Sequence, residues 1–209
     1  EGKFEDVSGS VFSDSEAISA ITCLNLDIDH DGDLDLFLGG KSDMVYRNNG
    51  DGTFKDVTQS MGFAKNSAIS RDVDLGDFDD DGDIDLFVSR EDGNNILYSN
   101  LRRGKFTDIT VEAGILAMKS SASSTIGDYN NDGSLDILTI SLDGNEIKLF
   151  KNKNSGEFVE DKSSSAAFGA LQLKNASDLS FLDFDNDGYQ DILIVGESQD
   201  PGRSGLFLM

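Results

Sequence analysis

The sequence has few of the residues on which several protein classes depend: 209 residues include one cysteine, one proline, one histidine and no tryptophan. The single cysteine, Cys23, excludes an intrachain disulfide framework. One cysteine and one histidine, His30, cannot assemble a Ser/His/Asp or Cys/His nucleophile system, so we expect no enzyme. No run approaches the ~20 apolar residues of a membrane-spanning helix, which argues against insertion into a membrane.

Basic residues are also scarce, with 17 Lys and Arg against 40 Asp and Glu and a net charge of −23. Phosphate backbones require the opposite sign, so nucleic acid is excluded as a partner. Apolar residues make up 37% of the chain, which is enough for one domain with a core. The first residue is Glu1 and not Met, which predicts a processed, trimmed or partial N-terminus.

What the chain does have is one motif in four copies, Asp-x-(Asp/Asn)-x-Asp-Gly-x-x-Asp, each followed by an apolar run. The first residues of the copies are Asp27, Asp77, Asp128 and Asp183, a period of about 50 residues. Oxygen ligands at positions 1, 3, 5 and 9 suit a hard divalent cation, and Gly at position 6 permits a sharp turn. The motif therefore predicts about four Ca²⁺ ions.

The predicted ligands are the side chains at positions 1, 3, 5 and 9 and the carbonyl at position 7. The predicted side-chain ligands are Asp27, Asp29, Asp31, Asp35, Asp77, Asp79, Asp81, Asp85, Asp128, Asn130, Asp132, Asp136, Asp183, Asp185, Asp187 and Asp191. The predicted carbonyl ligands belong to Asp33, Asp83, Ser134 and Tyr189. Asn130 carries no charge, so the third loop is expected to bind most weakly.

Two other interpretations of these loops are less suitable. An EF-hand needs a bidentate Glu at position 12, where this chain has Leu38, Val88, Thr139 and Ile194. Mg²⁺ gives up its bound water reluctantly, whereas these loops would replace that water with protein oxygens, so Mg²⁺ is disfavoured. His30, at position 4 of the first loop, is expected to point outward without a special role.

Short apolar runs around each loop predict four strands per repeat, which is the composition of a propeller blade. Tyr46, Tyr98 and Phe150 recur in register and are expected in the blade core, and Cys23 shares a column with Val73 and is expected to be buried. The predicted domain is 1–209, with blade units at about 9–58, 59–110, 111–161, and 162–209 plus 1–8.

Residues 2–8 match the fourth strand of a repeat, and residues 206–209 match a third strand with no fourth after it. We therefore expect an all-β propeller of four four-stranded blades, with the N-terminal strand completing the last blade. Two alternatives remain open: four blades of a seven- or eight-bladed propeller, and strand exchange between molecules that builds a filament.

The repeat resembles the FG-GAP and VCBS repeats of integrin α-subunits and of many secreted bacterial proteins. The resemblance rests on residues 127–136 and 49–58 and extends over practically the whole chain. It implies β-propeller blades that hold Ca²⁺ in the hairpin between the first two strands.

By this resemblance, we expect a non-catalytic extracellular or cell-surface module for adhesion, surface binding or assembly, with the periplasm as an alternative location. Expected partners are protein or glycan ligands at the cell surface or matrix, and copies of the chain itself. A carbohydrate-binding module, or the propeller part of a carbohydrate-active enzyme, is the alternative. Asn175 begins the one N-glycosylation sequon.

Overall fold

The structure, a computed structural model, describes residues 2–12, 18–63, 68–102, 104–198 and 204–208. Three antiparallel four-stranded sheets follow one another along the chain, each in the order of its strands. The first contains β1 (Ala20–Leu26), β2 (Asp35–Gly40), β3 (Met44–Asn48) and β4 (Phe54–Asp56). The second contains β5 (Ser70–Gly76), β6 (Asp85–Arg90), β7 (Ile96–Asn100) and β8 (Phe106–Asp108). The third contains β9 (Ser121–Gly127), β10 (Asp136–Ser141), β11 (Ile147–Asn152) and β12 (Phe158–Glu160).

The last sheet has three strands among the described residues, β13 (Leu173–Leu182), β14 (Asp191–Ser198) and β15 (Ser204–Leu208). Below, the four sheets are called blades 1 to 4. The all-β fold and its blades agree with the prediction, while the boundaries predicted between the repeats stay a prediction.

Three short helical segments were not expected: α1 (Ser8–Val11), η1 (Ile115–Ala117) and α2 (Lys162–Gly169). Helix α2 begins after Asp161, whose carboxylate accepts hydrogen bonds from the backbone N–H groups of Ser163 and Ser164. This is an ordinary N-cap; the hydroxyl of Ser163, and after it the hydroxyl and N–H of Ser164, lower the pKa of Asp161. The helix buries Phe168 in the core between blades 3 and 4. None of the helices in the described residues is long and apolar enough to cross a membrane.

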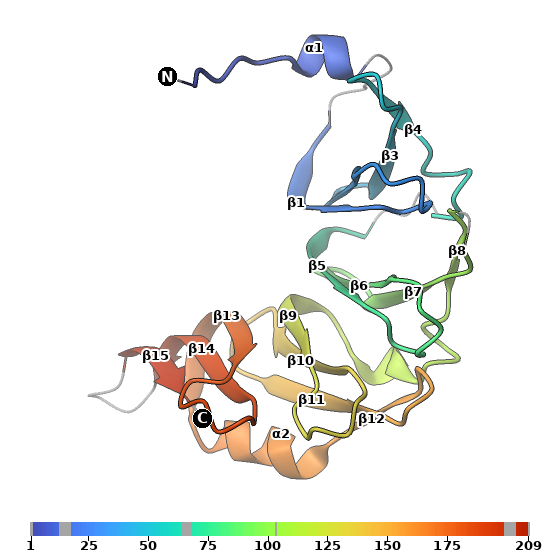
Figure 1. Ribbon diagram of the computed structural model, residues 1–209. Coiled ribbons are helices and arrows are strands. Elements are labelled where there is room, and N and C mark those ends of the chain that lie inside the picture. Colours follow the sequence, from blue (N-terminus) through green and yellow to red (C-terminus); the bar gives the residue numbers. More distant parts are fainter. Residues whose placement is uncertain (1, 13–17, 64–67, 103, 199–203, 209) are drawn as a thin grey trace.

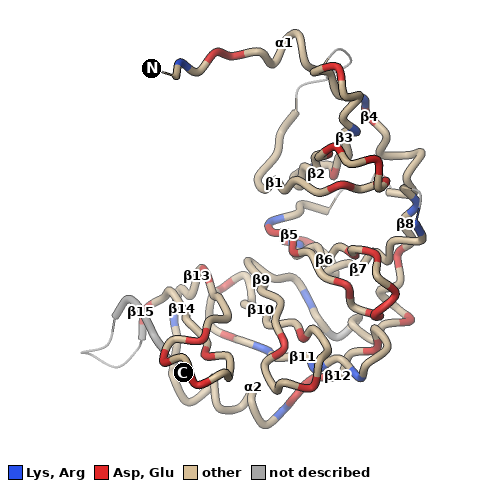
Figure 2. The backbone as a smooth tube through the Cα atoms, viewed as in Figure 1, with Lys and Arg blue, Asp and Glu red and all other residues tan. Residues whose placement is uncertain are grey.

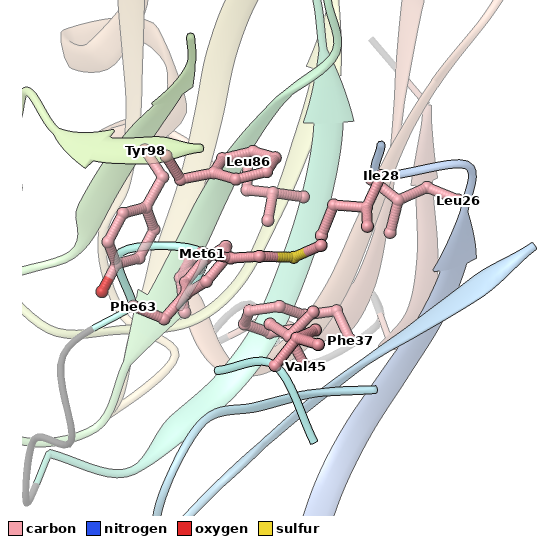
Figure 3. Packing of buried hydrophobic residues seen from close by; sticks show 11 residues of the cluster. Leu26, Ile28, Phe37, Val45, Met61, Phe63, Leu86 and Tyr98 are labelled. Carbon is pink, nitrogen blue, oxygen red and sulfur yellow. The ribbon is translucent and has the colours of Figure 1, made fainter. Parts of the chain in front are cut away.

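A separate hydrophobic core fills the space between each pair of consecutive blades. Between blades 1 and 2, Ile28 and Phe37 pack in one cluster with Leu86 and Val88, and all four are fully buried (Figure 3). Similar clusters join blade 2 to blade 3 and blade 3 to blade 4. Tyr46, Tyr98 and Phe150 are each 2% exposed, which confirms their predicted place in the core. The unit that buries apolar surface is thus a pair of blades, and not a single sheet.

The four blades form an open arc, with their first strands on its inner side and the short fourth strands on its outer side (Figure 1). The N-terminal segment lies far from blade 4, and residues 2–7 belong to no strand. The predicted completion of the last blade by the N-terminal strand is therefore wrong for this structure. The open arc is compatible with the alternative of a larger propeller.

The strand pairings are consistent with this. In blade 1 the fourth strand pairs with Tyr46, Arg47 and Asn48 of the third strand. In blade 4, Leu208 pairs with Leu193 as Val45 pairs with Phe37 in blade 1, and the described part of β15 does not pair with residues 2–8. Of the third strand predicted at 206–209, residue 209 lies outside the described residues.

Cys23 is exposed, contrary to the prediction of a buried side chain. The reason is its place on blade 1: residues in the same column of the later blades, such as Ser124 and Leu179, are covered by the preceding blade. Among the described residues, no blade lies in front of blade 1.

A buried ion pair joins blades 1 and 2, and its contribution to stability can be tested by mutation. Arg90 Nη2 lies 3.1 Å from Asp43 Oδ2, with both residues almost fully buried. Removing one partner leaves an uncompensated buried charge, so Arg90→Met is expected to lower the free energy of unfolding by about 3–5 kcal/mol. Urea unfolding measures this loss. The double variant Arg90→Met/Asp43→Leu should lose clearly less than Arg90→Met alone, and an equal or larger loss would contradict the account.

Candidate metal centres

The loop between the first two strands of every blade has one backbone conformation. The residue at position 4 has a positive φ of 55° to 63°, in His30, Asp80, Asn131 and Asn186. The glycine at position 6 has a φ of 88° to 91°, a region that side chains rarely allow. Glycine at this position lets the chain turn back so that the acidic side chains face one another.

The first carboxylate of each loop shapes the turn. In loop one, Asp27 accepts hydrogen bonds from the N–H groups of Asp31 and Gly32, at 3.1 and 3.0 Å. Asp77, Asp128 and Asp183 make the same two contacts in the other loops. Because the same two hydrogen bonds recur in all four loops, the first aspartate holds the turn in shape through the backbone, independently of any bound ligand.

The last carboxylate ties the loop to the sheet. Asp85 is 1% exposed and accepts hydrogen bonds from the N–H groups of Phe78 and Asn100, at 3.1 and 2.8 Å. Asp35 and Asp136 do the same in their blades, with Asn48 and Asn152 as the strand donors.

Sequence reasoning assigned no role to these asparagines. Each of them also donates from its side-chain amide to the carbonyl at position 8, which is Leu34, Ile84 or Leu135. Their regular recurrence as Asn48, Asn100 and Asn152 was the signal that could have revealed the role.

Carboxylates from positions 1, 3 and 9 converge in three of the loops. In each group, one oxygen atom per residue lies within 4.8 Å of the others, and the groups are Asp27/Asp29/Asp35, Asp77/Asp79/Asp85 and Asp183/Asp185/Asp191. Acidic residues gather at these loops along the arc (Figure 2). The structure thus brings together three of the four predicted side-chain positions.

Two features of the protein indicate that these groups suit a cation. Burial, and then the neighbouring Asp31, raises the pKa of Asp29, and Asp29 Oδ1 is buried without a hydrogen-bond partner. Burial likewise raises the pKa of Asp35 and Asp79, and it raises the pKa of Asp85 to about 6. Crowded, desolvated carboxylates favour protonation unless a positive charge lies among them. An oxygen-only donor set of this kind fits Ca²⁺.

The third loop differs in charge. Asn130 donates from its amide to Asp136 Oδ2 at 3.2 Å, where the other loops have a third carboxylate. Lys151 Nζ lies 2.8 Å from Asp132 Oδ2, and this hydrogen bond lowers the pKa of Asp132. Burial raises the pKa of Asp136 to about 6. Loop three therefore has one carboxylate fewer than the other loops, as expected from the sequence, and a lysine that the predicted ligand set did not consider.

Positions 5 and 7 stay predictions. The position 5 carboxylates of Asp31, Asp81, Asp132 and Asp187 each accept a hydrogen bond from the N–H group at position 7. This contact uses one oxygen of each carboxylate; in Asp132 the second oxygen is the one that Lys151 contacts. The predicted carbonyls of Asp33, Asp83, Ser134 and Tyr189 belong to the same short turns.

One contact between neighbouring loops was not predicted. His30 Nε2 lies 3.4 Å from Asp83 Oδ1, so the first loop reaches the second. Arg102 Nε also contacts Asp83, at 2.5 Å from Oδ2, and its Nη2 donates to the carbonyl of Asp81 at 3.0 Å. The His30 contact needs blades 1 and 2 side by side, which sequence periodicity alone does not give, whereas Arg102 lies within blade 2, between β7 and β8.

Calcium affinity should depend on pH. Asp85 and Asp136 have pKa values of about 6, so lowering the pH from about 7.5 to about 5 protonates two predicted ligands and weakens binding. Calorimetric titration at the two pH values checks this, with proton release near pH 6 as a second readout. In EDTA the sign reverses, because a folded pKa above the unfolded value of ~4 makes stability rise as the pH falls through about 6. Binding that is independent of pH over this range would contradict the assignment.

The charge of the third loop offers a second prediction. Asn130→Asp restores a carboxylate at position 3, so the affinity of the weakest site should rise, by about tenfold if the gain is ~1.4 kcal/mol. Calcium titration measures the change. Asn131→Asp adds the same charge one residue later, at position 4, and should change affinity far less. Equal effects of both variants would show that only overall charge matters.

Comparison with known proteins identifies the repeat. The model of the FG-GAP-like repeat matches three overlapping segments, residues 27–88, 77–139 and 128–194. No curated protein matches the chain. Among solved structures, the chain is similar to the crystal structure of the V. cholerae biofilm matrix protein Bap1, with 16% identity and a TM-score of 0.44. That alignment covers 82% of this chain and 23% of Bap1, so the chain spans less than a quarter of that protein. On the family match, which includes most of its residues, the chain belongs to the FG-GAP-like repeat family.

Proposed function

We propose that the chain is a non-catalytic, calcium-binding, extracellular β-propeller module that serves in adhesion, surface binding or protein assembly. The observation that carries this proposal is the convergence of three carboxylates in each of loops one, two and four. Membership of the FG-GAP-like repeat family supports the extracellular role. The open arc supports an arrangement in which these blades form part of a larger ring, of seven or eight blades.

The residues proposed to hold Ca²⁺ also connect the strands. In blade 2, Asp77 shapes the loop and Asp85 begins β6 while it accepts a hydrogen bond from the backbone of Asn100 in β7. When bound, Ca²⁺ would neutralise the crowded carboxylates of such a loop. Each ion would therefore stabilise a hairpin and the strand beside it.

The numbers and positions of histidine and cysteine favour a non-catalytic module. His30 is the single histidine of the sequence, and it lies against Asp83 in a loop. Cys23 is the single cysteine, and it is on an inner strand of blade 1. We therefore assign neither residue to a nucleophile–base pair.

A carbohydrate-binding role has one observation in its favour. Tyr189 and Phe184 are 62% and 64% exposed in the fourth loop, and exposed aromatic rings can stack on sugars. A glycan array in Ca²⁺, with Tyr189→Ala as the comparison, tests this role. Binding that Tyr189→Ala abolishes would support it, and no bound glycan would leave protein ligands as the partners.

The proposal predicts that chelation destabilises the domain. Ca²⁺ at 100 times its dissociation constant would add about 2.7 kcal/mol of stability per independent site. Thermal unfolding should therefore occur at a clearly lower temperature in EDTA than in Ca²⁺. Asp85→Asn should lose part of this difference, because it removes a carboxylate from one loop only. A melting temperature that is the same in EDTA and Ca²⁺ would contradict the structural role of the metal.

Surface binding has its own test. Labelled protein is applied to immobilised extracellular matrix in Ca²⁺ and in EDTA, and retention in Ca²⁺ that EDTA abolishes is the expected result. Retention that is unchanged by EDTA would contradict a calcium-dependent binding module.

A further inference from the structure

Blade 4 ends the arc with an apolar face that the other blades keep covered. We count positions from the first aspartate of each loop. At position 2, Ile28 and Phe78 are 0% and 2% exposed beneath the following blade, whereas Phe184 is 64% exposed. At position 11, Phe37, Phe87 and Leu138 are fully buried, and Leu193 is half-buried. Val195, at position 13, is 39% exposed. We call Phe184, Leu193 and Val195 the end face.

Blade 1 begins the arc with the complementary face. At positions 10 and 12, Leu86 and Val88 of blade 2 are fully buried against blade 1. Their counterparts in blade 1, Leu36 and Leu38, are half-buried, and Cys23 beside them is exposed. We call Leu36, Leu38 and Cys23 the start face.

The turns before the fourth strands give an independent indication. A Cβ placed on Gly104 would lie 3.3 Å from Asp29 Cβ, and one on Gly156 would lie 3.4 Å from Asp79 Cβ, in each case on the preceding blade. A Cβ on Gly52, the matching residue of blade 1, would meet nothing within 4 Å. Blade 1 therefore has the shape that fits a preceding metal loop, and no loop in the described structure fills it.

We propose that the end face of one copy docks on the start face of a second copy, and that two four-bladed arcs close into one eight-bladed ring. The contact repeats the packing between blades that the molecule already uses three times, so it needs no new kind of surface. Both halves of it are present on one chain, at opposite ends of an open arc (Figure 1). This inference rests on the blade architecture and not on the proposed role in adhesion.

The polar groups at the junction are also compatible. Within the molecule, the residue at position 4 reaches the next loop: His30 lies near Asp83, and Asn131 donates to the carbonyl of Gly188 at 2.9 Å. At the junction, Asn186 would take this position and face the exposed Asp33 of the second copy, an amide donor opposite a carboxylate. Each chain has a net charge of −23, so association should be strongest in Ca²⁺ and at moderate salt.

Mass in solution tests the proposal. Size-exclusion chromatography with light scattering, in Ca²⁺ and over a range of concentrations, should give a dimer of twice the 22.6 kDa chain mass. Val195→Asp places a charge on the end face and should shift the protein to monomer, with a dissociation constant at least tenfold higher. Val159→Asp adds the same charge at a residue of similar exposure, 44%, on outer strand β12, and should remain dimeric. A monomer at every concentration, or an open series of polymers, would overturn the proposal.

Crosslinking fixes the register of the contact. A Cβ on Gly39 would lie 3.2 Å from Ser70 Cβ across the interface between blades 1 and 2. The strand pairings make Val195 the counterpart of Gly39 and Ala20 the counterpart of Ser70. The variant Ala20→Cys/Cys23→Ser/Val195→Cys should therefore form an intermolecular disulfide dimer on mild oxidation. The variant Ala20→Cys/Cys23→Ser/Val159→Cys is the control.

On a non-reducing gel, dimer from the first variant and little from the control is the expected result. Equal crosslinking of both variants would overturn the register. Because this readout does not depend on matrix binding or on a ligand, its failure would leave the proposed function standing, and loss of matrix binding would leave the dimer standing.

Discussion

The repulsion among carboxylates in the hairpin loops is the constraint on which the other features depend. Three of the four loops bring aspartates from positions 1, 3 and 9 together, and in blade 2 the last of them, Asp85, is almost fully buried. Burial raises the pKa of that carboxylate to about 6, and the nearby Asp79 and Asp81 add to the rise, so the negative charge is unfavourable there without a cation. The three loops with converging carboxylates therefore suit a bound cation.

The blades depend on the loops in turn, because the same residues that face the loop centre also organise the strands. Asp85 accepts hydrogen bonds from the N–H groups of Phe78 in its loop and of Asn100 in β7. A change in the charge of Asp85 therefore alters the strength of both hydrogen bonds. Phe78 is itself part of the core between blades 2 and 3. Metal binding, hairpin formation and packing of the next blade are therefore linked through one or two residues, without any longer path between them.

The sequence was sufficient for those features that repeat within one blade. The spacing of Asp27, Asp77, Asp128 and Asp183 predicts the loops, and the apolar runs after them predict the strands, since both depend on neighbours close along the chain. It was not sufficient for contacts between blades. The pair Arg90–Asp43 and the helix after Asp161 have no counterpart in the other repeats, so periodicity gives no signal for them. The pairing of the N-terminal segment with blade 4 is not found in this structure, because it depends on how the blades curve in space, which a match of strand patterns does not fix.

The central claim is that the loops bind calcium, and the most direct measurement is a calorimetric titration of the chelated protein with Ca²⁺ near neutral pH. The account predicts binding of about four ions per chain, with one site weaker than the others because Asn130 replaces an aspartate. A titration without any heat of Ca²⁺ binding would contradict it. Four sites that still bind after replacement of Asp27, Asp77, Asp128 and Asp183 by asparagine would contradict it as well.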